Sequence, residues 1–318
     1  GGSGMNWSEQ TMRAMCRCVC CPRQCGADRA NGQKGLCGAG LNVSVARAMP
    51  HFYEEPCISG SRGSGTVFFR GCSLRCVFCQ NDEISRAGDA GQGLSLDALC
   101  ETVDGLARRG VHNISFVTPT HYAFQIADAL RYLQLPMPVV WNSGGYDRPE
   151  TVEMLGESVD IWLPDLKFAG NAAAARFTAV RDYADFAFPA VRRMAELAGP
   201  ARFDGEGMMT RGVLVRHLCL PGMTGQSKRV LDWIGKTLGA SVKVSLMRQY
   251  VPAGRAKEMP PLNRKLSGAE YERVFDYMVN LGLADGFVQD DAAAEEGYVP
   301  SFNGEGVAGD WMREERDR

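Results

Sequence analysis

Three cysteines, Cys72, Cys76 and Cys79, lie within eight positions of the sequence, in the stretch GCSLRCVFCQN. Thiolates ligate zinc ions and iron–sulfur clusters. At this C-x3-C-x2-C spacing, three thiolates can ligate three irons of a [4Fe–4S] cluster and leave the fourth iron open to a small molecule. The alternative is a zinc loop with a distant Cys or His as fourth ligand, because four ligands close a structural zinc site. Phe78, directly before the last cysteine, would shield a centre on this loop from water.

A second group of cysteines lies nearer the amino terminus. Four of them have C-x2-C-x3-C-x11-C spacing, and these are Cys18, Cys21, Cys25 and Cys37. Four thiolates make a complete ligand set, so we predict a second metal site. It is either a zinc ion that orders a loop-rich module without a core of its own, or an auxiliary [4Fe–4S] cluster. Cys16 and Cys20 are spare thiols that could replace a ligand.

The composition limits the class of protein. The chain has 318 residues with 45% hydrophobic and 23% charged residues, which is ordinary for a globular protein. The net charge of −2 gives no general reason to expect a nucleic-acid partner. We find neither a signal peptide nor an apolar run long enough to span a membrane, so we expect a cytoplasmic protein. In a reducing cytoplasm, the twelve cysteines are expected to bind metal rather than form disulfides.

Strand-like and helix-like stretches alternate from about residue 64 onward. Helical periodicity is clear at 95–110, where Ser95 can cap the helix and Gly110 can end it. Further helices are expected near 119–133, 149–157, 171–180, 184–198, 227–239 and 267–282. Buried strands are expected within 65–71, 113–117, 137–143, 159–168, 211–222, 241–252 and 286–289. This alternation predicts parallel βαβ units, and an α/β barrel carries its functional residues just after the strands.

We divide the chain into four parts. Residues 1–15 are a tag and an N-terminal extension, with GGSG before Met5 interpreted as a remnant of cloning. Residues 16–63 form the Cys-rich metal-binding module, and 64–289 form the barrel. Residues 290–318 form an acidic C-terminal tail with nine Asp or Glu against three Arg.

The three-cysteine motif resembles the signature of the radical S-adenosylmethionine (SAM) enzymes, which carry it after the first barrel strand. The surrounding stretch EEPCISGSRGSGTVFFRGCSLRCVFCQNDEIS (54–85) resembles, more narrowly, the uncharacterised relatives of pyruvate formate-lyase activating enzyme. This resemblance runs from about Cys18 to the tail. It implies a partial (β/α)6 TIM-type radical SAM barrel with a [4Fe–4S] cluster on Cys72, Cys76 and Cys79. It also implies that SAM binds the open iron and is cleaved reductively to a 5′-deoxyadenosyl radical, which abstracts hydrogen from a substrate.

The resemblance implies SAM-binding roles for residues after two of the expected strands. The family often places Gly-Gly-Glu after its second strand, to receive the methionyl amine. Here the stretch is VTPTHY, so only the backbone role carries over, to Thr118, Pro119 and Thr120. The alternative is a helix start capped by a threonine. After the third strand, in WNSGGY, Asn142 and Ser143 offer short polar contacts to a ribose or carboxylate, the alternative being a plain Gly-Gly turn.

Two further strands carry charged candidates. Asp165 and Lys167 in PDLKF resemble an Asp-x-Lys pair that contacts SAM in activating enzymes, whereas the alternative is a salt bridge at the barrel rim. Arg216 is a candidate for the SAM carboxylate, because its fork of donors suits bidentate recognition. Gln249 and Tyr250 are weaker candidates, and His121 is expected to be a packing or surface residue. We interpret the acidic stretch HFYEEP (51–56) as a solvated face rather than a source of a general acid or base.

The leading hypothesis is a radical SAM oxidoreductase that activates a glycyl-radical enzyme. A flavodoxin or a ferredoxin would donate the electron. A second hypothesis is radical SAM chemistry on a peptide, another protein side chain or a small metabolite. A third is a zinc-binding interaction protein on a degenerate barrel, but a binding protein has no need of the SAM-contacting elements around Asn142, Asp165 and Arg216. The sequence does not identify the substrate.

Overall fold

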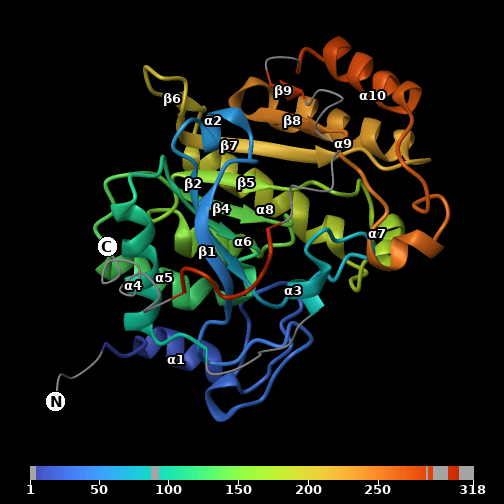
Figure 1. The fold of residues 1–318 in the computed structure, drawn as a ribbon. Helices are drawn as coiled ribbons and strands as arrows, with labels where there is room; N and C mark the ends of the chain where they lie inside the picture. The colour runs from blue at the N-terminus through green and yellow to red at the C-terminus, as the bar shows by residue number, and fades with distance from the viewer. Residues whose placement is uncertain (1–4, 87–92, 284–285, 289–299, 308–318) are drawn as a thin grey trace.

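The computed structural model describes residues 5–86, 93–283, 286–288 and 300–307. Within them, six parallel strands follow one another across the sheet, as predicted for a partial (β/α)6 barrel (Figure 1). They are β2 (Ser64–Phe69), β3 (Ile114–Val117), β4 (Val139–Ser143), β5 (Ile161–Pro164), β7 (Met209–Leu218) and β8 (Lys243–Met247). Every residue of β2, β3, β4 and β5 is buried, because helices cover the outside of a parallel sheet and side chains fill its inside. A short strand β9 (Phe287–Val288) pairs parallel to β8.

Helices connect these strands and surround the sheet (Figure 1). The α4 helix begins where expected, because the Ser95 hydroxyl accepts a hydrogen bond from the Ala98 amide at 3.3 Å. A capping box between Ser267 and Glu270 likewise starts α10. The helices are α4 (Leu96–Arg108), α5 (Ala123–Tyr132), α6 (Pro149–Leu155), α7 (Asn171–Phe177), α8 (Tyr183–Ala198), α9 (Thr224–Thr237) and α10 (Gly268–Asn280). None of the helices in the described ranges is both long and apolar enough to cross a membrane.

The sheet begins with a strand that was not expected from the sequence. The β1 strand (Val45–His51) pairs antiparallel with β2, although its residues lie in the stretch interpreted as a loop-rich module. The buried side chains of Ala46 and Ala48 are small, so their alternation gives a weak hydrophobic signal. The sheet therefore starts before residue 64. Other short elements outside the predicted set are α1 (Glu9–Cys16), α2 (Pro56–Ser59), α3 (Asp82–Arg86) and β6 (Arg202–Phe203).

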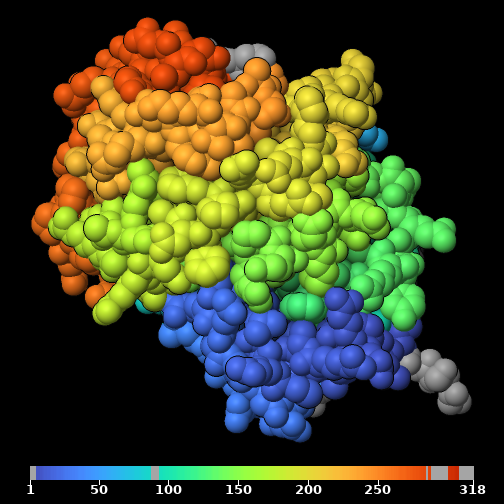
Figure 2. All heavy atoms as spheres, turned by 180° about the vertical axis from the view of Figure 1, so that it is seen from behind, coloured from blue at the N-terminus to red at the C-terminus, as the bar shows by residue number. Residues whose placement is uncertain are grey.

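The two ends of the described chain pack against the barrel differently. The N-terminal residues gather at one end of the molecule, opposite α10 (Figure 2). The segment 300–307 runs beside β1, where Gly304 N–H donates to Ala46 O at 2.9 Å and Ala48 N–H donates to Glu305 O at 3.0 Å. Phe302 packs edge-on against Phe68 with ring centroids 5.5 Å apart. The rest of the predicted acidic tail, 290–299 and 308–318, lies outside the described residues.

Candidate functional site

A cavity of about 230 Å³ lies where the carboxyl ends of the parallel strands meet. Its lining follows the strand order: Cys72 comes after β2, Thr118 after β3, Gly144 after β4 and Asp165 after β5. Most of the predicted site residues line this one cavity, namely Cys72, Cys76, Phe78, Cys79, Thr118, Asn142, Ser143, Asp165, Lys167 and Arg216. The parallel topology brings together residues from five strands or the loops that follow them, as the barrel prediction required.

The three thiols of the cavity suit an anionic metal centre. Burial raises the pKa of Cys76, and it raises the pKa of Cys79 to about 11. The ammonium group of Lys167 acts in the opposite direction and lowers the pKa of Cys76. The Leu74 amide donates a hydrogen bond to the Cys72 sulfur at 3.3 Å. The Lys167 cation thus favours the thiolate form of Cys76, although burial outweighs this effect on its pKa. Phe78, which belongs to this loop, is buried. It packs edge-on against Phe168 and Tyr250, with centroid distances of 6.2 and 6.3 Å.

The spacing of these thiols also bears on the kind of centre. No three Cys, His, Asp or Glu side chains in the described part of the chain converge to hold one metal ion together. A [4Fe–4S] cluster has a different requirement, because each thiolate binds a separate iron and the sulfurs need not meet at one point. The residues on the 72–79 loop therefore fit a cluster with three protein ligands.

A chain of charged side chains crosses the cavity wall. Lys167 Nζ lies 2.5 Å from one carboxylate oxygen of Asp165, and Arg216 Nε lies 2.8 Å from the other. The pKa of Asp165 is lowered, because Arg216 and Lys167 outweigh a burial that by itself would raise it. The pKa of Lys167 is raised in turn, since the pull of Asp165 outweighs burial. All three side chains are therefore ionised at neutral pH, and the pair is part of a buried network rather than an isolated bridge at the rim.

The acidic stretch before α2 closes this network, which corrects its interpretation as a solvated face. Arg216 Nη1 donates to Glu54 Oε2 at 2.7 Å and Nη2 donates to Asn142 Oδ1 at 2.6 Å. Glu55 is also buried, and burial raises its pKa even though Arg216 acts in the opposite direction. Sequence reasoning missed Glu54 because nothing local shows that residues 162 positions apart meet. The placement of β1 beside β2 brings it there.

His51, at the end of β1, also lines the cavity. Burial, with Arg216 and Arg47 nearby, lowers its pKa to about 4, so its imidazole is neutral at physiological pH. Other lining residues that the sequence did not single out are Tyr53, Phe68, Leu74, Gln80, Asn81, Leu218, Met247 and Pro300.

The backbone after β3 is strained where it meets the cavity. Thr118 has φ +57°, and a β-branched residue rarely adopts this left-handed conformation. Its amide donates to Asn142 O at 2.9 Å, which holds the turn against the end of β4. Pro119 and Thr120 are not among the lining residues, and the Thr120 hydroxyl donates to Asp147 at 2.7 Å. Backbone strain of this kind clusters at functional sites. The sequence could not reveal it at Thr118, because the value of φ is known only from the structure.

Several weaker candidates have structural roles. Ser143 lines the cavity, but its hydroxyl donates to Asp147. Tyr250 is buried and donates to Leu262 O at 2.6 Å, whereas Gln249 reaches the cavity lining. His121 is a packing residue, with Nε2 2.8 Å from Arg70 O.

The N-terminal cysteines form a separate cluster outside the cavity. Burial raises the pKa of Cys21 to about 12, against a hydrogen bond from the Arg23 backbone, and the charges of Cys37, Cys18 and Cys25 add to the increase. Cys20 lies beside Cys18, and Arg29 donates to both sulfurs, at 3.6 and 3.7 Å. Cys18, Cys21, Cys25 and Cys37 thus influence one another electrostatically, but no three of them converge on one metal ion among the described residues, so the second metal site stays a prediction.

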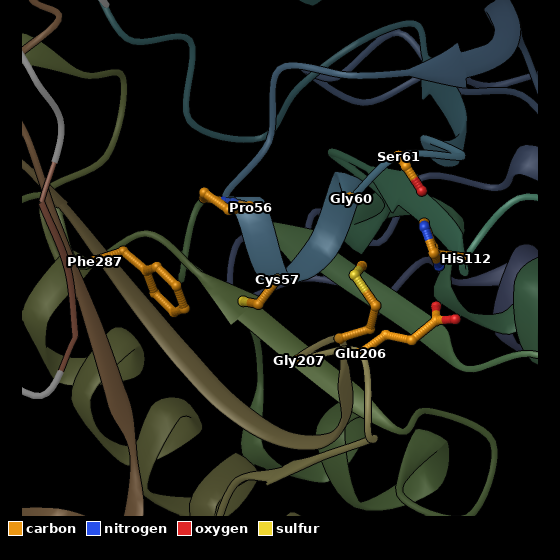
Figure 3. A pocket seen from close by; sticks show the side chains of 9 residues that line it. Pro56, Cys57, Gly60, Ser61, His112, Glu206, Gly207 and Phe287 are labelled. Atoms are coloured by element: carbon orange, nitrogen blue, oxygen red, sulfur yellow. The ribbon is translucent and has the colours of Figure 1, made fainter.

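A second hollow, of about 460 Å³, lies at the opposite ends of the strands (Figure 3). His112, just before β3, and Met208, just before β7, line it together with Cys57, Gly60 and Glu206. The amino ends of barrel strands seldom carry chemistry. We therefore place the functional site at the carboxyl ends.

Comparisons with known proteins agree with this geometry. Residues 66–234 match the family model of the radical SAM superfamily. A protein of Methanocaldococcus jannaschii, named "Uncharacterized protein MJ0674", is 30% identical over 268 residues, which are 81% of this chain and 73% of that protein.

Two solved structures share parts of the architecture. Streptococcus suis SuiB bound to S-adenosylmethionine matches with a TM-score of 0.50 and 14% identity, over 70% of this chain and 49% of SuiB. A domain of pyruvate-formate lyase-activating enzyme from Bacteroides vulgatus matches with a TM-score of 0.42 and 15% identity, over 55% of this chain and 96% of that domain. This chain spans about half the length of SuiB, and at this identity the likeness extends to the fold alone.

Proposed function

Because this chain belongs to the radical SAM superfamily, we propose that the cavity at the carboxyl ends of its strands is the site of reductive SAM cleavage. As a member of this superfamily it is an enzyme that binds SAM. One observation carries the proposal: Cys72, Cys76 and Cys79 line the same cavity as Asp165, Lys167 and Arg216. A zinc-binding interaction protein has no need of such a cavity beside its metal loop.

The three thiols are the proposed ligands of the [4Fe–4S] cluster. When bound, the reduced cluster and SAM together supply a 5′-deoxyadenosyl radical that takes a hydrogen atom from the substrate. Burial raises the thiol pKa of Cys76 and Cys79, so loading the site must release protons from these residues. Phe78 and Phe168 exclude water from one side of the loop.

The charged network is the proposed holder of SAM. Arg216 would receive the ligand's carboxylate, and Asp165 and Lys167, which are paired with each other and with Arg216, would orient it from the neighbouring strand. Thr118 and Asn142 present backbone and amide groups from the next two strands. Pro119, Thr120 and Ser143 would support these groups indirectly. The Thr120 and Ser143 hydroxyls donate to Asp147, so their contacts shape the turn rather than the cavity. Convergence of groups from several strands is how a barrel orients a small ligand.

We further propose that the substrate is a protein glycine, so that the enzyme is an activase of a glycyl-radical enzyme. The rim supports a large substrate: Tyr53 lines the cavity although 57% of its surface is exposed, and Phe52 beside it is also exposed. Exposed aromatic residues at a rim are typical of surfaces that bind polypeptides. A peptide, another protein side chain or a small metabolite is the alternative substrate. The electron would come from a flavodoxin or ferredoxin, and the N-terminal cysteines would hold a further centre, [4Fe–4S] or zinc.

The test is an anaerobic assay of the reconstituted protein with a reductant and SAM. We expect 5′-deoxyadenosine from the wild type and none from Cys76→Ala, while Cys16→Ala, an exposed thiol outside the cavity, keeps the activity. If Cys76→Ala still forms 5′-deoxyadenosine, the proposed cluster site is wrong. For the activase role, mixing with a glycyl-radical enzyme from the same operon should produce a glycyl doublet in the EPR spectrum. Turnover of SAM without that doublet, for every such partner, would point to the alternative substrates.

A further inference from the structure

The N-terminal cysteines surround a buried positive charge. Arg29 is only 1% exposed, and Nη1 donates to the sulfurs of Cys18 and Cys20 and to His121 O, the last at 2.7 Å. Its Nε donates to Gly40 O at 2.8 Å, and Nη2 is buried without a hydrogen-bond partner among the described residues. No carboxylate in the described part of the chain pairs with this guanidinium. A buried charge is costly unless an opposite charge compensates it, so an anion is expected at the thiols.

The backbone around these thiols forms a tight knuckle. Cys18 N–H donates to Ala27 O and Gly26 N–H returns to Cys18 O, both at 3.0 Å, so the two ends of the loop are paired. At its tip, Gln24 N–H donates to Cys21 O at 3.0 Å, and Gln24 has φ +40°. This turn presents Cys18, Cys21 and Cys25 from one short hairpin.

The segment that carries Cys37 also makes room for the sulfur of Cys25. A Cβ atom on Gly35 would lie 2.7 Å from Cys25 Sγ, so any larger residue would displace that sulfur. Cys37 follows two residues later, in the same segment. Gly35 therefore belongs to the site although it carries no ligand atom, because its small size makes room for the sulfur of Cys25.

We infer that Cys18, Cys21, Cys25 and Cys37 bind a metal centre with four thiolate ligands, and that Arg29 compensates its net negative charge. The centre is independent of the SAM site, because its ligands are a complete set and none of them lines the cavity. A zinc ion and a [4Fe–4S] cluster share this tetrathiolate chemistry. No three of the described thiols converge on one point, which favours a cluster whose thiolates bind separate irons, and the metal content distinguishes the two.

The site also contacts the loop that carries Cys72. The Cys37 carbonyl packs against Gly71, where any Cβ would collide with it. Arg23 Nε donates to Ser73 O at 2.7 Å, and Arg75 donates to Leu36 O. A centre that orders residues 18–37 therefore also supports the cavity loop from behind.

The test is made on a variant that lacks the proposed cluster ligands of the SAM site. A negative result then counts against the N-terminal metal centre and not against the proposed function. The full chain with Cys72, Cys76 and Cys79 all changed to Ala is reconstituted anaerobically, and its iron, sulfide and zinc are counted. We expect either about four irons with sulfide or one zinc per chain. Adding Cys25→Ala, an exposed position, should abolish this stoichiometric metal, whereas adding Cys16→Ala should not.

A second variant tests the role of Arg29. Arg29→Gln in the same background should lose metal to a competing chelator at about tenfold lower chelator concentration, the lower end of the effect typical for groups that hydrogen-bond metal ligands. Circular dichroism checks that each variant is folded. The inference is overturned if the triple variant is folded but metal-free, or if Cys25→Ala retains a full complement of metal.

Discussion

Glu54 and Arg216 form an ion pair of 2.7 Å inside the cavity, although 162 positions separate them in the chain. With Asp165 on Nε and Asn142 on Nη2, each of the three guanidinium nitrogens of Arg216 has a hydrogen-bond partner. We expect a ligand carboxylate that binds Nη1 to compete with Glu54 for the same nitrogen. The Glu54–Arg216 ion pair is therefore expected to weaken SAM binding at Arg216.

Glu54→Gln is expected to strengthen SAM binding about fivefold, on the order of 1 kcal/mol, because a neutral amide competes less well for Arg216 than a carboxylate. Equilibrium dialysis of the cluster-loaded protein with SAM measures this change. Glu55→Gln is the matched control, since Glu55 is also buried but does not bond to Arg216 among the described contacts. Weaker SAM binding in Glu54→Gln would show that Glu54 is a ligand-binding group rather than a competitor.

Asp165→Asn is expected to destabilise the fold by about 2 kcal/mol, because Lys167 and Arg216 both lose their shared counter-charge. Urea denaturation of the wild type and the variant measures the difference. Lys167→Met is the comparison and should cost less, since Asp165 keeps Arg216 as a partner. Equal losses for the two variants would contradict a central role for Asp165 in the network.

Thr118 offers a test of backbone strain. Glycine adopts φ +57° without the steric cost that a Cβ atom incurs, so Thr118→Gly should be about 1 kcal/mol more stable than Thr118→Ala. Both variants lose the same hydroxyl and methyl groups, so the comparison isolates the backbone term. The free energy of unfolding in urea is the measurement. An alanine variant at least as stable as the glycine variant would mean that this turn is not strained.

Three buried histidines should make the fold acid-sensitive. Burial lowers the pKa of His51, His121 and His217 to about 4 each, against 6.5 for the exposed group. Between these values the unfolded chain binds more protons than the folded one, so stability is full above pH 6.5 and is lost as the pH falls toward 4.

His121→Gln should flatten this dependence by on the order of 1 kcal/mol or more between a pH of about 7 and about 5. Urea midpoints of wild type and variant, each loaded in the same way, give the difference at each pH. Comparing the two proteins cancels acid loss of bound metal. Parallel curves over this range would rule out a neutral buried His121.

Much of the fold could be predicted because its signals are local. The strand and helix alternation from β2 to α10 is visible as short apolar runs between amphipathic stretches, and Ser95 and Ser267 mark helix starts by their own side chains. The β1 strand escaped prediction because Ala46 and Ala48 bury little apolar surface. Its stability comes from pairing with β2, a partner that lies about twenty residues away.

The sequence by itself determined which residues can ligate metal, since thiol chemistry and C-x3-C-x2-C spacing are readable without a fold. It also placed Asp165 and Lys167 at the end of an apolar strand, with both side chains on one side because the strand period is two. The resemblance to the family selected Arg216. Only the tertiary structure decided that Glu54 neutralises Arg216, that Thr118 is strained and that Arg29 lies among the N-terminal thiols. These are contacts between distant segments, and packing of the whole chain fixes them.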